Sequence, residues 1–182
     1  MKIKDVYSEC AILKNDVIKL KRTTMDDAEE LLKCYSDKNA IPLFNSDNCN
    51  GDTFYYQTIE RMKQGIELWE FYYKSKKFVR WTITLNYTNE KIGTIEMFNR
   101  DGKNGVLRID LQSQYEVHKV IEAILVIANE YFYDLFSVEG IFTKAIPCAN
   151  KRITVLEELD YKLADKNIFK FDNYYWRQRV SE

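Results

Sequence analysis

The longest regular pattern in the sequence is amphipathic and covers residues 117–135. Apolar residues recur there at intervals of three and four, the spacing that places side chains on one face of an α-helix. The apolar positions are Val117, Val120, Ile121, Ile124, Leu125, Ala128, Tyr131, Phe132 and Leu135, and the polar ones are His118, Lys119, Glu122, Asn129 and Glu130. The pattern predicts a helix of about five turns. It should bury Ile124 and Ala128 against a sheet and expose Glu122 and Glu130.

The segment in front of this helix, residues 106–111, is predicted to be a strand that leads into a sharp turn. A helix that begins directly after a strand leaves backbone N–H groups unpaired at its N-terminus, where the helix dipole also favours negative charge. Helix N-termini of this kind bind phosphate groups. We therefore expect an anion-binding position at the start of the helix.

Alternating apolar and polar residues predict the other strands. They fall at residues 17–21, 78–86 and 91–99 before the central helix, and at 141–146, 167–171 and 174–178 after it. A first helix should start at Thr24, which forms a capping box with Asp27. A second should be capped by Asp52 and end near Gly65, and a last helix should cover residues 150–159.

The lengths of the connections indicate the topology. Short turns between residues 78 and 111 predict an antiparallel meander, whereas the long helical crossing makes strands 106–111 and 141–146 parallel. The expected fold class is α/β, or α+β, with one domain over residues 1–182. Its sheet should be mixed and mostly antiparallel, with helices on both faces.

Composition narrows the choice of partners. Lys and Arg total 27 against 28 Asp and Glu, and the net charge of −1 provides no field to hold nucleic acid. One histidine and four cysteines without a CxxC pair predict no metal site. No signal peptide or membrane-spanning segment is recognised, so we expect a cytoplasmic protein that does not bind membranes.

Four segments together resemble the GNAT acyltransferase superfamily, and its ribosomal-protein N-acetyltransferase branch most closely. They are IKLKRTTMDDAEELL at residues 18–32, KIGTIEMF at 91–98, IEAIL at 121–125 and VLEELDY at 155–161. The resemblance covers about Val17 to Val180 and rests on the order and spacing of these segments. It implies a GNAT-like domain with acetyl-CoA as co-substrate.

The resemblance also implies a cofactor site formed mainly by backbone groups. Ile109, Asp110 and Leu111 correspond to the strand that pairs with the pantetheine arm. The turn at the start of the central helix corresponds to the segment that binds the pyrophosphate. Its implied amide donors are Val117, His118, Lys119 and Val120.

The glycines of that turn are absent here, and Glu116 and His118 stand near the two positions. Glycine allows backbone to approach a ligand closely. A carboxylate about 6 Å from a pyrophosphate charge would cost roughly 3 kcal/mol at an effective dielectric constant near 20. We therefore expect Glu116 to face the pyrophosphate and to weaken its binding, and expect Glu116→Gly to strengthen it.

Four further sets of residues allow two interpretations each. Asn150 is either a catalytic or cofactor-binding side chain or the N-cap of the last helix, and Ala149 is the alternative occupant of the family position. Glu96 is either a base acting through water or a residue on a solvated outer face. His118 is either a base or simply exposed. The aromatic residues at 54–56 and 69–73 line an acceptor pocket or pack at the edge of the core.

The expected function is acetyl-CoA-dependent N-acetylation of a primary amine, either a small amine or a protein N-terminus. The alternative is a degenerate GNAT-fold protein that no longer binds CoA and serves as an interaction module. The lack of an obvious base favours an acceptor of low pKa attacked directly on the thioester. The acceptor, the pathway and the oligomeric state, including a homodimer, are left open by the sequence.

Overall fold

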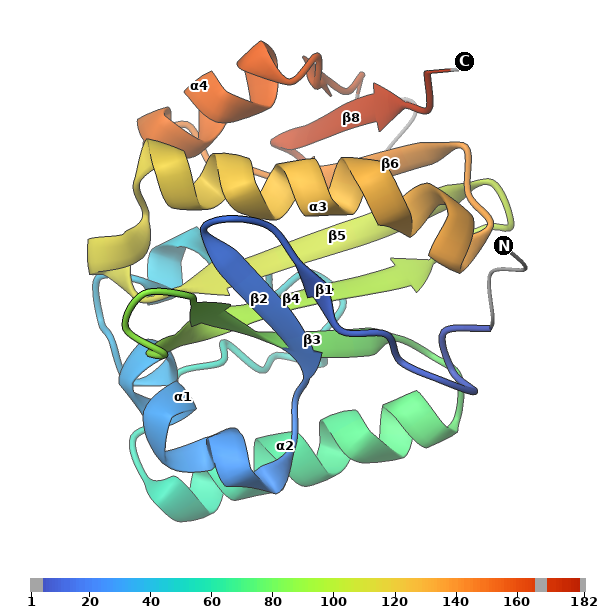
Figure 1. Ribbon diagram of the computed structural model, residues 1–182. Coiled ribbons are helices and arrows are strands. Elements are labelled where there is room, and N and C mark those ends of the chain that lie inside the picture. The colour runs from blue at the N-terminus through green and yellow to red at the C-terminus, as the bar shows by residue number, and fades with distance from the viewer. Residues whose placement is uncertain (1–4, 166–169, 181–182) are drawn as a thin grey trace.

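A single mixed sheet of eight strands organises the computed structural model, which describes residues 5–165 and 170–180 (Figure 1). The strand order is β1-β2-β3-β4-β5-β6-β8-β7. The strands are β1 (Leu13–Lys14), β2 (Ile18–Arg22), β3 (Val79–Leu85), β4 (Lys91–Asn99), β5 (Asn104–Leu111), β6 (Gly140–Lys144), β7 (Lys162–Leu163) and β8 (Tyr174–Gln178). Among the described strands only β5 and β6 pair in parallel, which confirms the mixed, mostly antiparallel sheet.

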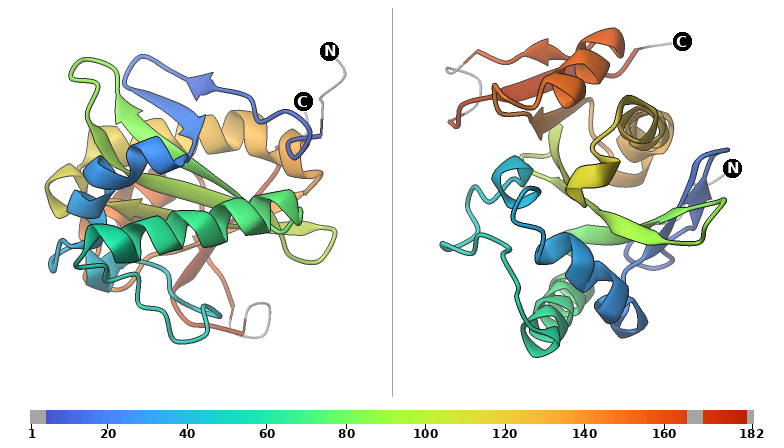
Figure 2. Two further views of the ribbon diagram at one scale, coloured as in Figure 1. Left: turned by 90° about the horizontal axis from the view of Figure 1, so that it is seen from below. Right: turned by 90° about the vertical axis from the view of Figure 1, so that its left-hand side faces the viewer.

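Helices cover both faces of the sheet, as predicted (Figure 2). They are α1 (Ala28–Tyr35), α2 (Ile59–Lys74), α3 (His118–Phe136) and α4 (Asn150–Glu158). Helices α1 and α2 lie on one face, and α3 lies on the other with α4 beside it (Figures 1 and 2). No helix in the described residues is long and apolar enough to cross a membrane.

The central helix follows the amphipathic pattern. Ile124 and Ala128 are fully buried, whereas Glu122 and Glu130 are exposed, as predicted. The main core lies between α3 and the sheet and is apolar, because alternate residues of β3, β4 and β5 point toward the helix. Trp81 of β3 stacks on Phe132 of α3 with ring centroids 5.0 Å apart.

The meander was predicted closely, and the first helix begins at its capping box. The Asp27 carboxylate accepts a hydrogen bond from the backbone N–H of Thr24 at 2.9 Å, and a short 3₁₀ turn then leads into α1. Strand β4 has the predicted bounds. Two strands were missed, β1 and β7, since each has only two residues and little pattern.

The prediction for the second helix is wrong. Helix α2 is capped by Thr58 and continues through Gly65 to Lys74, while residues 53–58 are not helical. Gly65 lies inside the helix, where its missing side chain makes room for Tyr56. A Cβ there would lie 2.9 Å from the Tyr56 ring.

The C-terminal hairpin differs from the prediction as well. Strand β8 pairs with β6 on one side and with the short strand β7 on the other. The strand predicted at residues 167–171 falls largely on residues 166–169, which lie outside the described residues. Lys170 and Phe171 form a bend.

Candidate functional site

The parallel strands β5 and β6 at the centre of the sheet stop pairing halfway along β5. Their pairing runs from Asn104 and Gly140 to Leu107 and Thr143. From Arg108 to Leu111, β5 is paired only with β4, because β6 ends at Lys144. The backbone groups of β5 on the side away from β4 therefore lack a strand partner over the segment that contains Ile109, Asp110 and Leu111.

Helix α3 begins just beyond this opening. Of the four amides expected to face a pyrophosphate, Val117 N–H donates to the Tyr115 carbonyl at 2.8 Å and Val120 N–H to the Val117 carbonyl at 3.1 Å. Within the described part of the chain, the N–H groups of His118 and Lys119 have no acceptor. The pair of free amides at a helix N-terminus is suited to an anion.

The turn before α3 needs no glycine. A 3₁₀ turn over Ser113–Tyr115 is followed by Glu116 at φ −73° and Val117 at φ −125°, values that ordinary residues adopt easily. None of the residues with positive φ in the described chain lies between residues 106 and 136. The path of the backbone thus explains how this turn forms without glycine.

Glu116 is paired with a buried arginine, a partner that the expected repulsion between its charge and a phosphate did not include. Its carboxylate is 9% exposed and receives two hydrogen bonds from Arg152 of α4, Nε to Oε1 at 2.7 Å and Nη2 to Oε2 at 2.8 Å. Arg152 also donates to the Leu43 carbonyl at 3.3 Å. A bidentate pair of this kind neutralises the carboxylate. It also ties α4, the turn before α3 and the loop after α1 together.

His118 is exposed at the start of α3. Its Nε2 lies 2.6 Å from Oε2 of Glu158 in α4, and its Nδ1 lies 3.9 Å from Glu122. The imidazole points to two surface carboxylates, which favours the exposed interpretation over a catalytic base. The neighbouring Lys119 is exposed too.

Asn150 is the first residue of α4 and not its N-cap, which is Ala149. The capping interpretation is therefore wrong. Ala149 is buried and Asn150 is exposed, and in the described residues its side chain makes no hydrogen bond. A role in holding a cofactor stays a prediction for Asn150.

Glu96 is 1% exposed, so the expected solvated outer face is wrong. A bulge at Ile92 interrupts the register between β3 and β4, so that Ile92 lies in the apolar core and Glu96 on the opposite face. Glu96 Oε1 accepts from Arg108 Nη1 at 2.7 Å, and Oε2 accepts from Arg80. Burial opposes ionisation, but the two guanidinium groups lower the pKa of Glu96. A carboxylate held in this way is a poor general base.

The sequence analysis missed the buried polar ladder to which Glu96 belongs. Its first row is Arg80, Glu96 and Arg108, which lie directly opposite one another on β3, β4 and β5, and its second row is Thr82, Thr94 and Asp110. The signal was present, since three successive predicted strands each carry two polar residues at alternate positions. Assigning it required the register of the strands.

Asp110 extends the ladder to the edge of the opening. Its Oδ2 accepts from Arg80 Nη1 at 2.9 Å and from the Tyr35 hydroxyl at 2.8 Å, whereas Oδ1 is buried without a hydrogen-bond partner in the described residues. Burial raises the pKa of this carboxyl. Asp110 was expected to contribute backbone groups only, and its side chain proves to be part of the buried ladder.

A pocket of about 390 Å³ lies over the first row of the ladder. We call it the aromatic pocket, because its walls include Phe54, Trp69, Tyr72, Phe78 and Phe98. Arg80, Glu96 and Arg108 also line it. Phe54 and Trp69 also belong to the second core cluster, so packing at the edge of the core is confirmed for these two rings, and an acceptor pocket stays a prediction.

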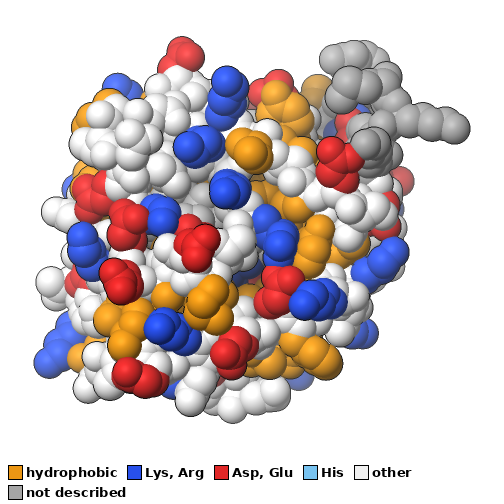
Figure 3. Space-filling view, turned by 60° about the horizontal axis from the view of Figure 1, so that its bottom comes forward, with side chains coloured by type: hydrophobic (Ala, Val, Ile, Leu, Met, Phe, Trp, Pro, Cys, Tyr) orange, Lys and Arg blue, Asp and Glu red, His pale blue; other side chains and the backbone are white. Residues whose placement is uncertain are grey.

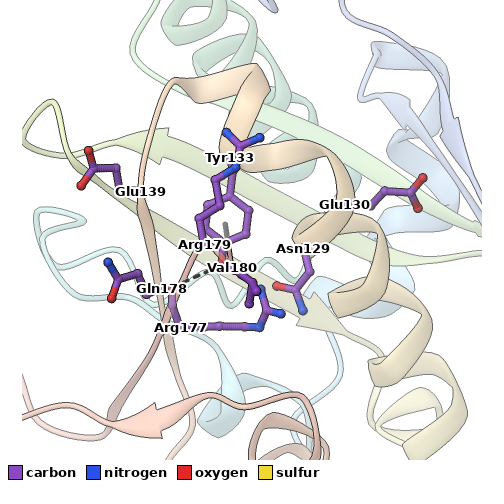
Figure 4. Close-up of a pocket in the computed structure, with 8 residues that line it drawn as sticks. All are labelled: Asn129, Glu130, Tyr133, Glu139, Arg177, Gln178, Arg179 and Val180. Carbon is purple, nitrogen blue, oxygen red and sulfur yellow. Dashed lines mark hydrogen bonds between the residues drawn. The ribbon is translucent and has the colours of Figure 1, made fainter. Parts of the chain in front are cut away.

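A larger hollow, of about 550 Å³, lies between the second half of α3 and the end of β8 (Figure 4). Arg177 Nη1 donates to the Tyr133 hydroxyl at 3.3 Å there, and Arg179 pairs with Asp134 at 2.6 Å. These cations already have partners, and the hollow lies at the opposite end of α3 from the free amides. It therefore carries no part of the candidate site.

No metal-binding group is found either. Across residues 5–165 and 170–180, no three His, Cys, Asp or Glu side chains come together as a metal site. The four cysteines are all free thiols, and burial raises the pKa of Cys10 to about 11.

Comparisons with known proteins agree with this architecture. Neither the models of protein families nor the curated proteins contain a match to the sequence. Among solved structures, an acetyltransferase of the GNAT family from Bacillus anthracis superposes with a TM-score of 0.70 at 13% identity, over 93% of this chain and 99% of that one. The ribosomal-protein-S5-alanine acetyltransferase of Vibrio fischeri gives 0.70 at 15% identity, over 93% and 97%.

A third similar structure, Mycobacterium smegmatis RimJ in complex with CoA-disulfide, gives a TM-score of 0.71 at 12% identity and covers 91% of this chain and 84% of that one. The structural neighbours are GNAT acetyltransferases, and some were solved with CoA or acetyl-CoA. At these identities the likeness establishes the fold. The chain has the GNAT fold, as the resemblance implied.

Proposed function

We propose that this chain is an acetyltransferase that uses acetyl-CoA and transfers the acetyl group to the nitrogen of an amine, either a small amine or a protein N-terminus. The observation that carries the proposal is the combination of two features at one place. Strand β5 loses its parallel partner after Leu107, and the amides of His118 and Lys119 are free just beyond the end of that strand. RimJ, which has the same fold, was solved with a CoA derivative.

The residues around the opening fit a diphosphate and an extended arm. The free amides and the dipole of α3 supply partial positive charge for the diphosphate. The unpaired edge of β5, with Ile109 and Leu111, supplies backbone groups for an arm that carries amides. Since Glu116 is neutralised by Arg152 at 2.7 Å, the repulsion expected from its charge is largely offset.

The proposed reaction asks little of side chains. Acetyl-CoA supplies a thioester whose carbonyl carbon the amine attacks. The new N–C bond forms as the C–S bond breaks, and the proton lost by the amine leaves with the thiol. A backbone N–H of β5 would donate to the carbonyl oxygen as negative charge develops on it.

The amine must reach this point in its neutral form. Glu96 is unsuited to remove a proton, because both of its oxygens are bound by arginines. An α-amine with a pKa near 8 is partly neutral at pH 7, whereas a lysine side chain would require roughly 4.6 kcal/mol. The arrangement therefore favours acceptors of low pKa.

A second candidate function follows from a specific observation. Arg152 is 2% exposed and joins three segments around the opening through Glu116 and Leu43. A permanently closed opening would make the chain a GNAT-fold protein that binds other molecules without using CoA.

A pair of variants at one residue separates the two functions. His118→Pro removes a free amide but fits the first position of a helix, and Val117 in front of it already has the extended conformation that proline requires. His118→Ala removes the same side chain and keeps the amide. Calorimetric titration with acetyl-CoA should give near-parental affinity for His118→Ala and a loss of about tenfold or more for His118→Pro, since a hydrogen bond to a charged group contributes about 1.5–3 kcal/mol.

Thermal unfolding provides the primary test of binding. Acetyl-CoA at a hundred times its dissociation constant should stabilise the parent by about 2.7 kcal/mol. For a domain of this size the melting temperature should rise by roughly 5–10 °C. An unchanged melting temperature at millimolar acetyl-CoA, or equal binding by His118→Pro and His118→Ala, would contradict the proposal.

A further inference from the structure

The aromatic pocket reaches the strand on which transfer is proposed to occur. Arg108 lines the pocket and is also the first residue of β5 beyond the last parallel pair, Leu107 and Thr143. A molecule held in this pocket therefore lies against the segment of β5 that leads into the opening. The pocket and the opening share one backbone segment, although they are built from different parts of the chain.

The shape and surface of the pocket indicate what kind of group it holds. Its volume of about 390 Å³ lies within the range of small-molecule sites, about 300–1,000 Å³. Its flat apolar walls are formed by the rings of Phe54, Trp69, Tyr72 and Phe78. The ring centroids of Tyr72 and Phe78 lie 5.3 Å apart. At this distance Tyr72 and Phe78 are in contact with each other, so they form one apolar wall on which a flat apolar group can stack with one face.

The charges of the pocket argue against a ligand with several positive charges. The Arg80 guanidinium already lies 4.2 Å from the Trp69 ring centroid, and that of Arg108 lies 5.2 Å from the Phe98 centroid. Cations thus occupy the ring faces that would otherwise attract a cationic ligand. Lys77 adds a third positive charge to the lining, against two carboxylates.

One of those carboxylates is also engaged. Asp52 binds Arg61 at 2.7 Å and accepts a hydrogen bond from the Tyr56 hydroxyl at 2.8 Å. The other is Glu96, held between its two arginines. On the face that carries α2, acidic and basic side chains are interspersed, with no acidic surface to attract a polycation (Figure 3).

We infer that the aromatic pocket holds the acceptor, and that the acceptor is a monoamine with one flat aromatic group, free or at the N-terminus of a short peptide. Transfer to this acceptor rests on the proposed function, whereas its binding in the pocket does not. An amine of this class, with an α-amino or aryl-amino nitrogen, has the low pKa that the site requires. Polyamines are disfavoured by the charges of the pocket and by their high pKa, and lysine side chains by their high pKa alone.

The test measures binding without acetyl-CoA. Phenylalanine amide, glycine amide and spermidine are titrated into the full chain by calorimetry. Phenylalanine amide should bind at least about tenfold more tightly than glycine amide, from burial of its ring. Spermidine should bind more weakly than phenylalanine amide.

Variants locate the binding. Tyr72→Ala removes a half-buried wall ring and should lower the affinity for phenylalanine amide by about fivefold to tenfold. Tyr87→Ala removes a ring that is 77% exposed and does not line the pocket, and it should have no effect. Circular dichroism melts of both variants show whether the fold is retained. A third variant, Leu68→Glu, repeats the test at a lining residue that is 47% exposed and lies outside the core.

The outcomes separate the two proposals. Binding of phenylalanine amide that depends on Tyr72 or Leu68, in a protein that does not bind acetyl-CoA, supports the pocket and refutes the transferase. Acetyl-CoA binding with transfer to spermidine in preference to phenylalanine amide overturns the inference and leaves the transferase standing. Equal binding of glycine amide and phenylalanine amide, or binding that neither pocket variant changes, overturns it too.

Discussion

The two faces of strands β3, β4 and β5 are both buried, yet they are made of different chemistry. The face toward α3 carries Trp81, Ile83, Ile95, Met97 and Ile109, which pack in one apolar cluster. The opposite face carries the polar ladder of Arg80, Thr82, Thr94, Glu96, Arg108 and Asp110. Apolar burial stabilises the fold directly, whereas buried ion pairs contribute little net stability. The comparison suggests that the first face keeps the chain folded and that the second serves the site.

The largest effect is expected on the apolar face. Ile124→Asp places a carboxylate at a fully buried position in the apolar core, so we expect a loss of more than about 4 kcal/mol and no soluble folded protein. Soluble expression and circular dichroism measure this. Val126→Asp, on the same helix but 39% exposed, is the control and should fold. A folded Ile124→Asp protein would contradict the assignment of α3.

A smaller loss is expected on the charged face. Glu96→Gln keeps the shape of the side chain but leaves Arg108 without a charged partner and Arg80 with Asp110 alone, which should cost about 3–5 kcal/mol. Urea denaturation measures the change, with Glu122→Gln on the exposed side of α3 as the control, expected within about 0.5 kcal/mol. A loss for Glu96→Gln as small as that of the control would mean that the ladder is not buried in solution.

The smallest effect is the change of stability with pH. Two carboxyl groups of the charged face, Glu96 and Asp110, should contribute to it with opposite signs. The pKa of Glu96 is lowered from its ordinary 4.5, so its contribution to stability is complete above pH 4.5 and disappears as the pH falls through the folded-state value. The pKa of Asp110 is raised from its ordinary 3.8, so the folded state holds that proton more tightly and stability decreases as the pH rises from 3.8 through the folded-state value.

Melting temperatures between pH 3 and 7 test these opposite signs. Relative to the parent, Glu96→Gln should flatten the decrease toward acid, and Asp110→Asn should remove part of the decrease toward neutral pH. Identical profiles for the two variants would contradict the assignment of different environments to the two carboxyl groups.

The apolar face was the part that the sequence could predict. Period-two patterns located β3, β4 and β5, and the period of α3 identified Ile124 and Ala128 as buried. These predictions succeed because both patterns depend on local spacing alone. The ladder was not predicted, because placing Arg80 opposite Glu96 depends on strand register, and the bulge at Ile92 shifts that register.

The error at α2 has a related cause. Gly65 was interpreted as a helix end from its local preference, but its role is to accommodate Tyr56 from another part of the chain. Likewise, the orientation of Glu116 depends on Arg152, 36 residues further along. The local sequence carries no information about either contact. The electrostatic repulsion predicted for Glu116 was therefore estimated without its partner Arg152.

The ion pair between Glu116 and Arg152 also restricts how this protein can evolve. Loss of either residue alone leaves a buried charge unpaired, which costs about 3–5 kcal/mol out of a total stability of about 5–15 kcal/mol. Each single change is thus destabilising, whereas a double change to uncharged residues of similar volume removes both buried charges together. We therefore expect sign epistasis between the two positions, with a fitness valley between the charged and the uncharged pair, and expect substitutions to be tolerated more readily at exposed positions of α4 and α3.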